Sequence, residues 1–424
     1  MGQITSNDVI ILISLSGESD ELKNIIQYAS RNKNLKLIGI TSKRDSTLYK
    51  NSDVKFLLPS VKEAGPGNFV PTSSTTVQIA LGDSIAITCM KYKKLPNTDL
   101  SVSLICLGTM TYGEQNNERE AHEQLDYSLS EGVNFIDTAD AYVAGESEKL
   151  IGRLIKANRN KWVLATKLAN KMNTVPHSGG LSRKWVVEAC DNSLRRLGTD
   201  YIDIYYLHKE DHLTPLDETI RAIGLLMMQG KIRYFGVSNY RSWRVAEICN
   251  ICDRLGIDRP IVSQPYYNAM NRMPETEHIP ACLNYGIGVV PYSPLARGLL
   301  TGKYKINKQP EKDSRVARKD KRIMQTEWRT ESVEIIEKIN EYAKRKGVTP
   351  IDISIQWLFN NKAVHSIVAG PRTLTQWKSY LAALDYKYTI EDEKLMNSLV
   401  VSGHSSTPGY NDPAYPIEGR YSKV

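Results

Sequence analysis

The sequence predicts an α/β protein in which a (β/α)₈ barrel, the TIM-barrel architecture, follows a smaller three-stranded parallel α/β fragment. Strands alternate with helices along the chain, as they do in parallel sheets. The pattern restarts near Met90, after three strands that make a thin sheet for an independent domain. Beyond that point eight apolar segments separated by helical patterns occupy about 300 residues, which suits a closed barrel.

The first part of the chain contains three predicted strands and three predicted helices. Its strands are short apolar runs such as LKLIGIT, and its helices carry apolar residues at helical spacing. The expected strands cover residues 8–17, 35–41 and 54–59, and the expected helices cover residues 19–32, 46–52 and 74–87.

The second part begins with a predicted hairpin over residues 92–103, and the barrel strands follow it. Each expected strand is four to eight residues long, and helices such as SRKWVVEACDNSLRRLG and RSWRVAEICNICDRLG lie between them. The eight expected strands are LICLGT, NFIDTA, WVLATK, YIDIYYLH, YFGVSN, PIVSQPYY, GVVPYSPL and HSIVAG.

Composition and charge exclude several classes of protein. Of the 424 residues, 41% are hydrophobic and 24% are charged, and no stretch reaches the roughly 20 apolar residues that span a bilayer. The N-terminus lacks the cationic start of a signal peptide, so we expect a cytoplasmic protein without a membrane partner. The net charge of +8 is modest and gathers only in the loop 312–322. We therefore expect no nucleic-acid partner, since an anionic cofactor accounts for the charge.

The six cysteines do not predict a disulfide framework or a metal site. They are scattered over the chain, which fits free thiols in a reducing compartment. Cys249 and Cys252 have CxxC spacing, but this spacing also places two residues on the core face of a helix, and no second CxxC accompanies them. We expect no bound metal.

Four polar residues follow three consecutive barrel strands and form the candidate catalytic group. Asp137 ends the second strand, Tyr142 lies in the loop after it, Lys167 ends the third strand and His208 ends the fourth. The carboxyl ends of barrel strands meet at one face, where active sites lie. Each residue alone has a structural explanation, as a solvated rim charge or a structural histidine or tyrosine. Their joint occurrence on strands two, three and four favours a catalytic site.

These four residue types suit carbonyl reduction. A phenol has a reference pKa of about 10, so it needs a neighbouring cation to stabilise the phenolate after it gives up its proton. Lys167 can supply that cation, and Asp137 can hold the ammonium in place. His208 can hydrogen-bond a carbonyl oxygen. The hydride must then come from a cofactor.

Seven segments in this order resemble the aldo-keto reductase family: LGTMTYGEQN, GVNFIDTADAY, VLATK, YIDIYYLH, GKIRYFGVSNY, PYSPLARGLLTGKY and IVAGPRTLTQW. They lie within residues 90–385, and with the tail they define a predicted barrel domain over residues 90–424. The resemblance implies NADPH-dependent (NADPH/NADP⁺) reduction of a small aldehyde or ketone, with Asp137, Tyr142, Lys167 and His208 as the catalytic tetrad. It leaves the substrate and the oligomeric state open.

The resemblance also implies a cofactor site. Ser238, Asn239 and Gln264 are expected to hold the nicotinamide carboxamide, and Tyr292 is expected to stack on the ring. The pyrophosphate is expected near Ser293, Leu295, Gly298, Thr301 and Lys303. The loop containing Gly370 is expected to hold the adenosine end, where Arg372 would bind the 2′-phosphate bidentately beside Gln376.

Two features lie outside the family pattern. Tyr380 stands where the family usually has asparagine, which puts the adenine contact there in doubt. The tail GHSSTPGYNDPAYPIEGR contains three prolines and two tyrosines and cannot form a regular helix. The tail either drapes over the barrel mouth and shapes substrate choice, or lies on the surface.

Residues 1–89 resemble the second half of a sugar isomerase (SIS) domain, closest to arabinose-5-phosphate isomerases. SLSGESDEL, LIGITSKRDSTL and PTSSTTVQIALGDSIAI carry the resemblance, which implies carbohydrate-derivative binding by Ser14, Ser16 and Ser19 at a helix N-terminus. Glu18 and Glu63 match acidic positions of that family. Its catalytic lysine and histidine segments are missing, so a gene fusion with a passive or incompletely folded appendage is expected.

Two rival functions remain from the sequence. Potassium-channel β subunits are similar barrels that act mainly as redox-sensing partners, and they retain the tetrad, so the tetrad alone does not exclude a regulatory role. A sugar-phosphate isomerase would need the segments that residues 1–89 lack.

Overall fold

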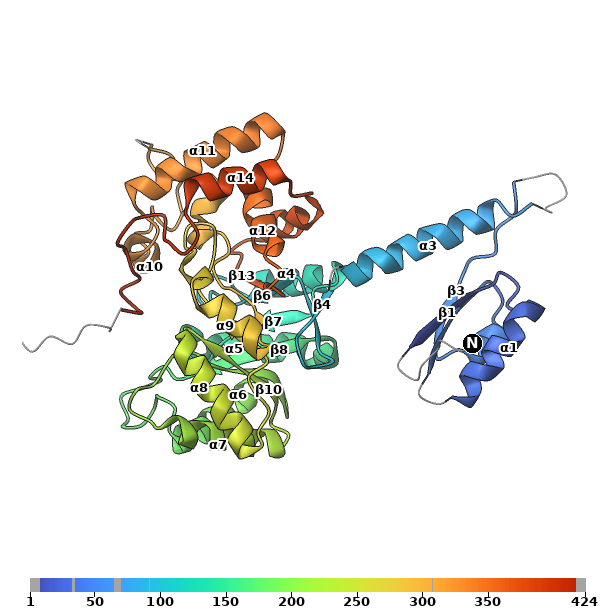
Figure 1. Ribbon diagram of the computed structural model, residues 1–424, viewed down its shortest axis with the longest axis horizontal. Coiled ribbons are helices and arrows are strands. Elements are labelled where there is room, and N and C mark those ends of the chain that lie inside the picture. The colour runs from blue at the N-terminus through green and yellow to red at the C-terminus, as the bar shows by residue number, and fades with distance from the viewer. Residues whose placement is uncertain (1–7, 33–34, 65–69, 91, 307, 417–424) are drawn as a thin grey trace, which may run out of the picture. The chain divides into compact units, whose positions relative to one another are not determined.

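The computed structural model describes residues 8–32, 35–64, 70–90, 92–306 and 308–416 (Figure 1). The chain forms two compact units, Met1–Met90 and Lys91–Val424. Each unit has its own sheet and its own hydrophobic core.

The first unit contains the predicted three-stranded parallel sheet. Its strand order is β1-β2-β3, and Val9 of β1 pairs with Lys36 of β2. Helices α1 and α2 contribute Ile26 and Leu48 to a core with Leu12 and Leu37. The elements are β1 (Val9–Ile13), α1 (Asp20–Arg31), β2 (Lys36–Thr41), α2 (Thr47–Asn51), β3 (Val54–Leu57) and α3 (Ser73–Met90).

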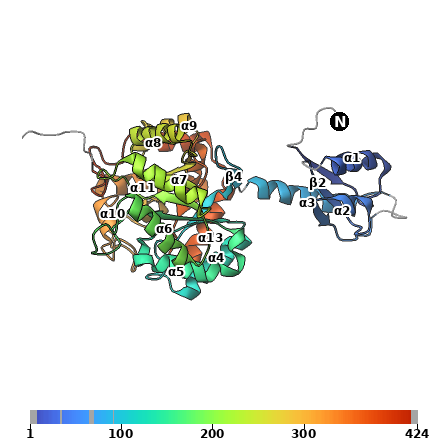
Figure 2. The ribbon, with the colours of Figure 1, turned by 90° about the horizontal axis from the view of Figure 1, so that it is seen from below.

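The second unit begins with an antiparallel hairpin and continues into eight parallel strands, as the sequence predicts. The sheet order is β12-β11-β10-β9-β8-β7-β6-β13, and helices cover its outside (Figure 2). The hairpin is β4 (Tyr92–Lys94) and β5 (Ser101–Ser103). The barrel strands are β6 (Ile105–Gly108), β7 (Phe135–Asp137), β8 (Val163–Leu168), β9 (Ile202–Leu207), β10 (Ile232–Ser238), β11 (Val262–Gln264), β12 (Gly288–Val289) and β13 (Ile367–Ala369).

Single bridges close the barrel between its first and last strands in the sheet order. Val289 pairs with Val364, and Tyr292 pairs with Val368, both in parallel. The amides of His365 and Val368 donate to the carbonyls of Val289 and Pro291 at 2.8 Å. The regular strand is shorter here than the predicted segment 288–295, because Pro291 and Pro294 have no amide to donate to a ladder. The (β/α)₈ fold is confirmed.

The helices of the second unit bury their apolar faces against the outside of the sheet. Two of the longer ones begin with capping boxes, Asn117 with Glu120 and Thr349 with Asp352, which satisfy free amides at the helix start. The α-helices are α4 (Glu118–Ser130), α5 (Glu146–Ile155), α6 (Arg183–Leu197), α7 (Leu216–Met228), α8 (Ser242–Leu255), α9 (His278–Tyr285), α10 (Lys321–Gln325), α11 (Thr330–Lys346), α12 (Pro350–Asn360), α13 (Leu374–Ala382) and α14 (Ile390–Leu399). Short 3₁₀ helices are η2 (Tyr142–Gly145), η3 (Lys156–Lys161), η4 (Met273–Glu275), η5 (Ala296–Thr301) and η6 (Ala383–Asp385).

Two further observations concern membrane-spanning helices and metal sites, neither of which the sequence predicts. Within the described ranges, no helix combines the length and the apolar character needed to cross a bilayer. In that same part of the chain, no group of three or more His, Cys, Asp or Glu side chains is arranged to hold a metal ion. Cys249 and Cys252 are free and buried in α8, in agreement with their core spacing.

Gly152 lets α5 pack directly against the end of α6, and this contact yields a prediction about stability. A Cβ at Gly152 would lie 2.3 Å from the carbonyl oxygen of Leu197, a backbone atom that cannot rotate away. Gly152→Ala should therefore lower the free energy of unfolding by about 2–3 kcal/mol. Urea denaturation followed by tryptophan fluorescence measures this, since all six tryptophans lie in the second unit.

The control for this change is Lys149→Ala on the exposed side of the same helix, where the side chain is 49% exposed. It should change the unfolding free energy by less than about 0.5 kcal/mol. Equal stabilities for Gly152→Ala and Lys149→Ala would contradict the packing argument.

Candidate active site

Side chains alternate between the inside and the outside of the barrel along each strand, and this alternation places the predicted catalytic group in the barrel interior. Side chains two residues apart in a strand lie on the same face. Phe135, Ala165 and Tyr206 belong to the barrel's inner core cluster, and Asp137, Lys167 and His208 follow them by two residues. The candidate residues therefore continue the inner face at its C-terminal end, where active sites of this fold lie.

Lys167 is the centre of the group. Its ammonium donates to the Asp137 carboxylate at 2.5 Å, to the Thr138 carbonyl at 2.8 Å and to the Tyr142 hydroxyl at 3.2 Å. The lysine and aspartate side chains are 0% and 1% exposed. All three ammonium hydrogens therefore have acceptors, as a buried cation requires.

The charges of this group act on one another. Burial by itself would lower the pKa of Lys167, but the Asp137 carboxylate outweighs it and the pKa is raised. Burial raises the pKa of Tyr142, and the positive charge of Lys167 opposes this only in part. At neutral pH the lysine is therefore charged and the tyrosine holds its proton.

His208 lies beside Tyr142, with the ring centroids 6.0 Å apart and the ring planes nearly perpendicular. Burial, followed by the charge of Lys167, places the pKa of His208 well below its ordinary value, so the ring is neutral. The amide nitrogen of Asn170 contacts Nδ1 at 3.0 Å. An amide nitrogen can only donate, so Nδ1 accepts and Nε2 carries the proton. Asn170 stands three residues after Lys167 in the sequence, and only that nearness could have pointed to it.

A cavity of ≈ 340 Å³ opens at this end of the barrel. Most of the residues predicted from the sequence line it. They are Asp137, Tyr142, His208, Ser238, Asn239, Gln264, Tyr292, Ser293, Leu295, Gly298, Lys303, Gly370, Arg372 and Gln376. Lys167 lies behind this wall and contacts Asp137 and Tyr142. Thr301 does not line the cavity, and its hydroxyl donates to the Gly298 carbonyl at 2.8 Å.

The residues expected to hold a nicotinamide form one hydrogen-bonded chain. The Tyr292 hydroxyl donates to Asn239 Oδ1 at 2.8 Å, and Asn239 Nδ2 donates to Ser238 Oγ at 3.1 Å. The Gln264 side-chain amide donates to the second oxygen of Asp137 at 2.8 Å, so it contacts the catalytic group as well as the cavity. One face of Tyr292 stacks on Tyr266, with centroids 5.5 Å apart.

The far end of the cavity is basic. Lys303 and Arg372 line it together with Arg315 and Arg318, which come from the basic loop 312–322. Burial, together with the charges of Arg315 and Arg372, lowers the pKa of Lys303 despite the opposing charge of Glu311. This excess of positive charge suits phosphate groups. The sequence contained a signal for Arg315 and Arg318, namely that basic loop, but did not place it at the site.

Tyr380, the departure from the family pattern, also lines this end. Its side chain is buried, and burial raises its pKa to about 12 although Arg315 opposes the shift. Gln376 Oε1 accepts from the backbone amide of Arg372 at 2.9 Å, so the side chain of Gln376 holds the loop that carries Arg372.

The tail drapes over the mouth of the barrel, the first of the two alternatives raised by its sequence. Its backbone pairs with the loop after β11, where the Arg272 amide donates to the His404 carbonyl and the Ser406 amide to the Met270 carbonyl, each at 2.8 Å. Tyr415 then lines the cavity.

The serines expected to bind a sugar phosphate lie in the first unit, at the start of α1. Ser14 and Ser19 share a hydrogen bond of 2.8 Å, and the Gly17 amide donates to Ser14 Oγ at 3.1 Å. The Ser16 hydroxyl accepts from the Glu18 amide at 3.2 Å. Glu18 accepts from Thr47, and Glu63 accepts from Thr72, so both glutamates hold local loops.

Asp140, two residues before Tyr142, is a second buried carboxyl at the site. It is 1% exposed, and neither oxygen has a hydrogen-bond partner among the described residues. Burial, with the nearby charge of Glu148, raises its pKa to about 8. Glu148 itself is paired with Arg196 at 2.6 Å and accepts from Thr166 at 2.6 Å. Asp140 is therefore largely protonated at neutral pH.

Comparison with known proteins assigns both parts of the chain. Residues 104–401 match the aldo/keto reductase family, and residues 1–88 match the SIS domain. A probable voltage-gated potassium channel subunit beta of Arabidopsis thaliana is 35% identical over 302 residues, which is 70% of this chain and 92% of the relative. An uncharacterised oxidoreductase of Bacillus subtilis (strain 168) is 31% identical over 75% of this chain and 98% of its own length. L-glyceraldehyde 3-phosphate reductase of Escherichia coli O157:H7 is 30% identical, over 72% and 90%.

The protonated state of Asp140 predicts how stability depends on pH. An unfolded aspartate loses its proton near pH 4, whereas folded Asp140 keeps it to about pH 8. Between these values the folded state binds one more proton, so this residue lowers the free energy of unfolding by up to about 1.4 kcal/mol per pH unit as the pH rises. Asp140→Asn should remove that contribution. Urea midpoints of both proteins at pH 5, 6.5 and 8 measure it, and parallel pH profiles would contradict it.

Proposed function

We propose that this chain, which belongs to the aldo/keto reductase family, uses NADPH to reduce the carbonyl group of a small aldehyde or ketone to an alcohol. The observation that carries the proposal is the position of Lys167, which contacts both the Asp137 carboxylate and the Tyr142 hydroxyl. A cavity lined by Tyr142 and His208 leads from this group to a basic end.

In this proposal Tyr142 is the general acid. The raised pKa of its phenol keeps the proton in place at neutral pH, so that the hydroxyl can donate it to the carbonyl oxygen. Once the proton has moved, the nearby ammonium of Lys167 stabilises the phenolate. Asp137 keeps that ammonium charged and fixes its position.

His208 orients the substrate. Its Nε2–H can donate to the carbonyl oxygen while Asn170 holds Nδ1, so the oxygen lies between the imidazole and the phenol. Bound NADPH supplies the hydride. The neutral state of the ring keeps a second cation away from the lysine and leaves proton donation to Tyr142.

The cofactor would lie along the cavity. Ser238, Asn239 and Gln264 offer polar groups for the nicotinamide carboxamide, and Tyr292 offers an aromatic face. Ser293, Leu295, Gly298, Thr301 and Lys303 belong to the segment proposed to follow the pyrophosphate, where Lys303 is the cation and Thr301 supports the Gly298 turn.

We assign the NADP preference to the basic end of the cavity. Arg372 is the proposed ligand of the 2′-phosphate, and Arg315 and Lys303 add positive charge beside it. Gly370 and Gln376 shape and hold the loop that carries Arg372. Tyr380 offers the adenine ring a buried aromatic neighbour in place of an amide.

A regulatory role is the second candidate function. The potassium channel subunit beta relatives favour it, and a tetrad of this kind is compatible with redox sensing. The two candidates differ in turnover, since a reductase must oxidise NADPH with an aldehyde present.

For the N-terminal unit we propose a passive role. Residues 1–89 would be a partial SIS-like fragment and residues 90–424 the reductase with its tail. The serines at the start of α1 already satisfy one another, and Glu18 and Glu63 hold local loops.

The first prediction concerns the general acid. Tyr142→Phe should lower kcat/KM for 4-nitrobenzaldehyde by about two or more orders of magnitude, since general acid catalysis contributes about that much, while NADPH binding stays within about threefold. Loss of NADPH absorbance measures the rate, and quenching of protein fluorescence measures binding.

The control for Tyr142→Phe is Tyr234→Phe near the start of β10, where the hydroxyl contacts Asp99 outside the cavity. It should leave the rate unchanged. If the wild-type protein binds NADPH and turns over no aldehyde, the regulatory function replaces the reductase.

The second prediction concerns the choice between cofactors. Arg372→Gln should weaken NADPH binding by about 10- to 100-fold, the usual loss for a charge-assisted hydrogen-bond pair. NADH lacks the 2′-phosphate, so its binding should change by less than about threefold. Arg221→Gln on the exposed side of α7 removes the same charge away from the cavity and should affect neither cofactor. Equal losses for NADPH and NADH would contradict the assignment.

A further inference from the structure

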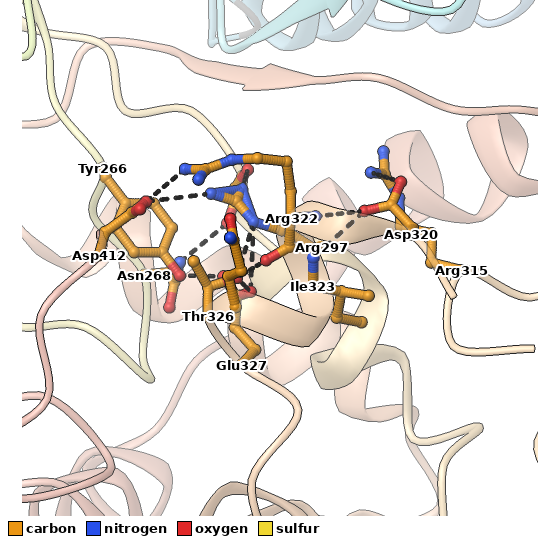
Figure 3. A network of polar contacts seen from close by, with 12 residues as sticks. Tyr266, Asn268, Arg297, Arg315, Asp320, Arg322, Ile323, Thr326, Glu327 and Asp412 are labelled. Atoms are coloured by element: carbon orange, nitrogen blue, oxygen red, sulfur yellow. Dashed lines mark hydrogen bonds and ion pairs between the residues drawn. The ribbon is translucent and has the colours of Figure 1, made fainter. Parts of the chain in front are cut away.

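Two arginines that line the cavity share a carboxylate from the tail. Arg322 pairs with Asp412 at 2.5 Å and Arg297 approaches it at 3.6 Å. Figure 3 shows both guanidinium groups directed at Asp412, with Tyr266, Thr326 and Glu327 around them. The side chains of Arg297 and Asp412 are each 8% exposed and that of Arg322 is 33% exposed, so Arg297 and Asp412 are shielded from bulk solvent while Arg322 is partly exposed.

This cluster lies close to the reacting end of the cavity. Arg297 and Arg322 line the cavity that contains Tyr142, whereas Asp412 and Glu327 line a neighbouring cavity of ≈ 1070 Å³. Asn239 and Tyr415 line both cavities. Tyr415 stands three residues after Asp412 and lies beside Tyr292, so the tail connects the arginine pair with the proposed nicotinamide site.

The two carboxylates of the cluster are held differently. Glu327 accepts from Tyr266 and Thr326 and pairs with Arg297 at 3.2 Å, so it is fixed by groups of the barrel and its loops. Asp412 comes from the tail. With Asp412 in place, two arginines face two carboxylates. When Asp412 leaves, one positive charge is uncompensated at the cavity wall.

We propose that Arg297 and Arg322 form a subsite for an anionic group on the carbonyl substrate, a carboxylate or a phosphate, and that Asp412 occupies this subsite as an internal anion until such a substrate binds. The inference rests on the proposed reductase function and names its substrate class. A planar guanidinium binds either anion through paired hydrogen bonds. An exchange of one anion for another keeps the buried Arg297 and the partly exposed Arg322 neutralised, which avoids the cost of an unpaired charge at a largely buried site.

The basic end of the cavity is a separate group, formed by Lys303, Arg315 and Arg372. Arg297 instead stacks over the Tyr266 ring at 5.1 Å and donates to Thr326 at 3.0 Å. Lys303, Arg315 and Arg372 therefore supply cations for the cofactor phosphates. Arg297 also donates to Ser293 of the proposed pyrophosphate segment at 3.4 Å, so the KM for NADPH has to be measured beside the substrate ratios.

The test compares two aldehydes of similar size, 4-formylbenzoate and 4-nitrobenzaldehyde. Asp412→Asn should raise the ratio of their kcat/KM values by about tenfold in favour of the carboxylate, because the internal competitor is gone while both arginines remain. Arg322→Gln should lower the same ratio by about tenfold. Glyceraldehyde 3-phosphate against glyceraldehyde repeats the comparison for a phosphate, and the pair with the larger change identifies the anion.

The control for net charge is Asp191→Asn, which removes a carboxylate paired with Lys231 at 2.7 Å on an outer helix. It should leave both ratios at the wild-type value. If Asp412→Asn leaves the ratios unchanged while the neutral aldehyde is still reduced, the subsite is overturned and the reductase function stands. If Asp412→Asn alters the KM for NADPH and not the ratios, the arginine pair serves the cofactor and the subsite is likewise overturned.

A binding measurement separates the two proposals when no aldehyde is turned over. Hydrogen exchange of tail amides within residues 405–416 should become faster with 4-(hydroxymethyl)benzoate, as the carboxylate displaces Asp412, and should not respond to 4-(hydroxymethyl)benzamide. Arg322→Gln should abolish the response. Such a response without turnover would keep the anion site and refute the reductase, whereas no response in the wild type would overturn the anion site.

Discussion

The buried ion pair of Lys167 and Asp137 is the constraint on which the rest of the site depends. Removing an ammonium from water costs several kcal/mol unless opposite charge and hydrogen bonds replace the solvent. The Asp137 carboxylate, the Thr138 carbonyl and the Tyr142 hydroxyl supply that replacement. Gln264 then satisfies the other oxygen of Asp137. The position of the phenol is thus fixed by the same contacts that make a charged lysine tolerable inside the barrel.

The barrel produces this arrangement because side chains alternate between its interior and its exterior along each strand. Phe135, Ala165 and Tyr206 fill the interior, and two residues later each strand places a polar group at the open end. A one-residue shift in register would turn Lys167 outward, away from Asp137 and Tyr142. The apolar layer below and the polar group above are therefore specified together, and the tetrad and the core share one structural cause.

The strand pattern and the residues that end each strand are local features of the sequence, which is why the barrel and the positions of Asp137, Tyr142, Lys167 and His208 could be predicted. Contacts between segments that are far apart in the sequence could not be predicted. The partnership of Asn170 with His208 depends on the turn after β8. Arg315 and Arg318 reach the cavity from a loop that sequence alone describes only as basic. The raised pKa of Tyr142 also depends on burial, which residue types do not reveal.

The tail shows why such long-range contacts matter for function. Asp412 brings a carboxylate from 90 residues away in sequence to Arg322, and Tyr415 reaches Tyr292. Its charge pairs with the buried Arg297 and the partly exposed Arg322, which would otherwise have one carboxylate, Glu327, between them. An enzyme that must accept an anion in a shielded pocket faces this problem whenever the substrate is absent. A movable carboxylate solves it, because the same arginines stay neutralised in both states and only the partner changes.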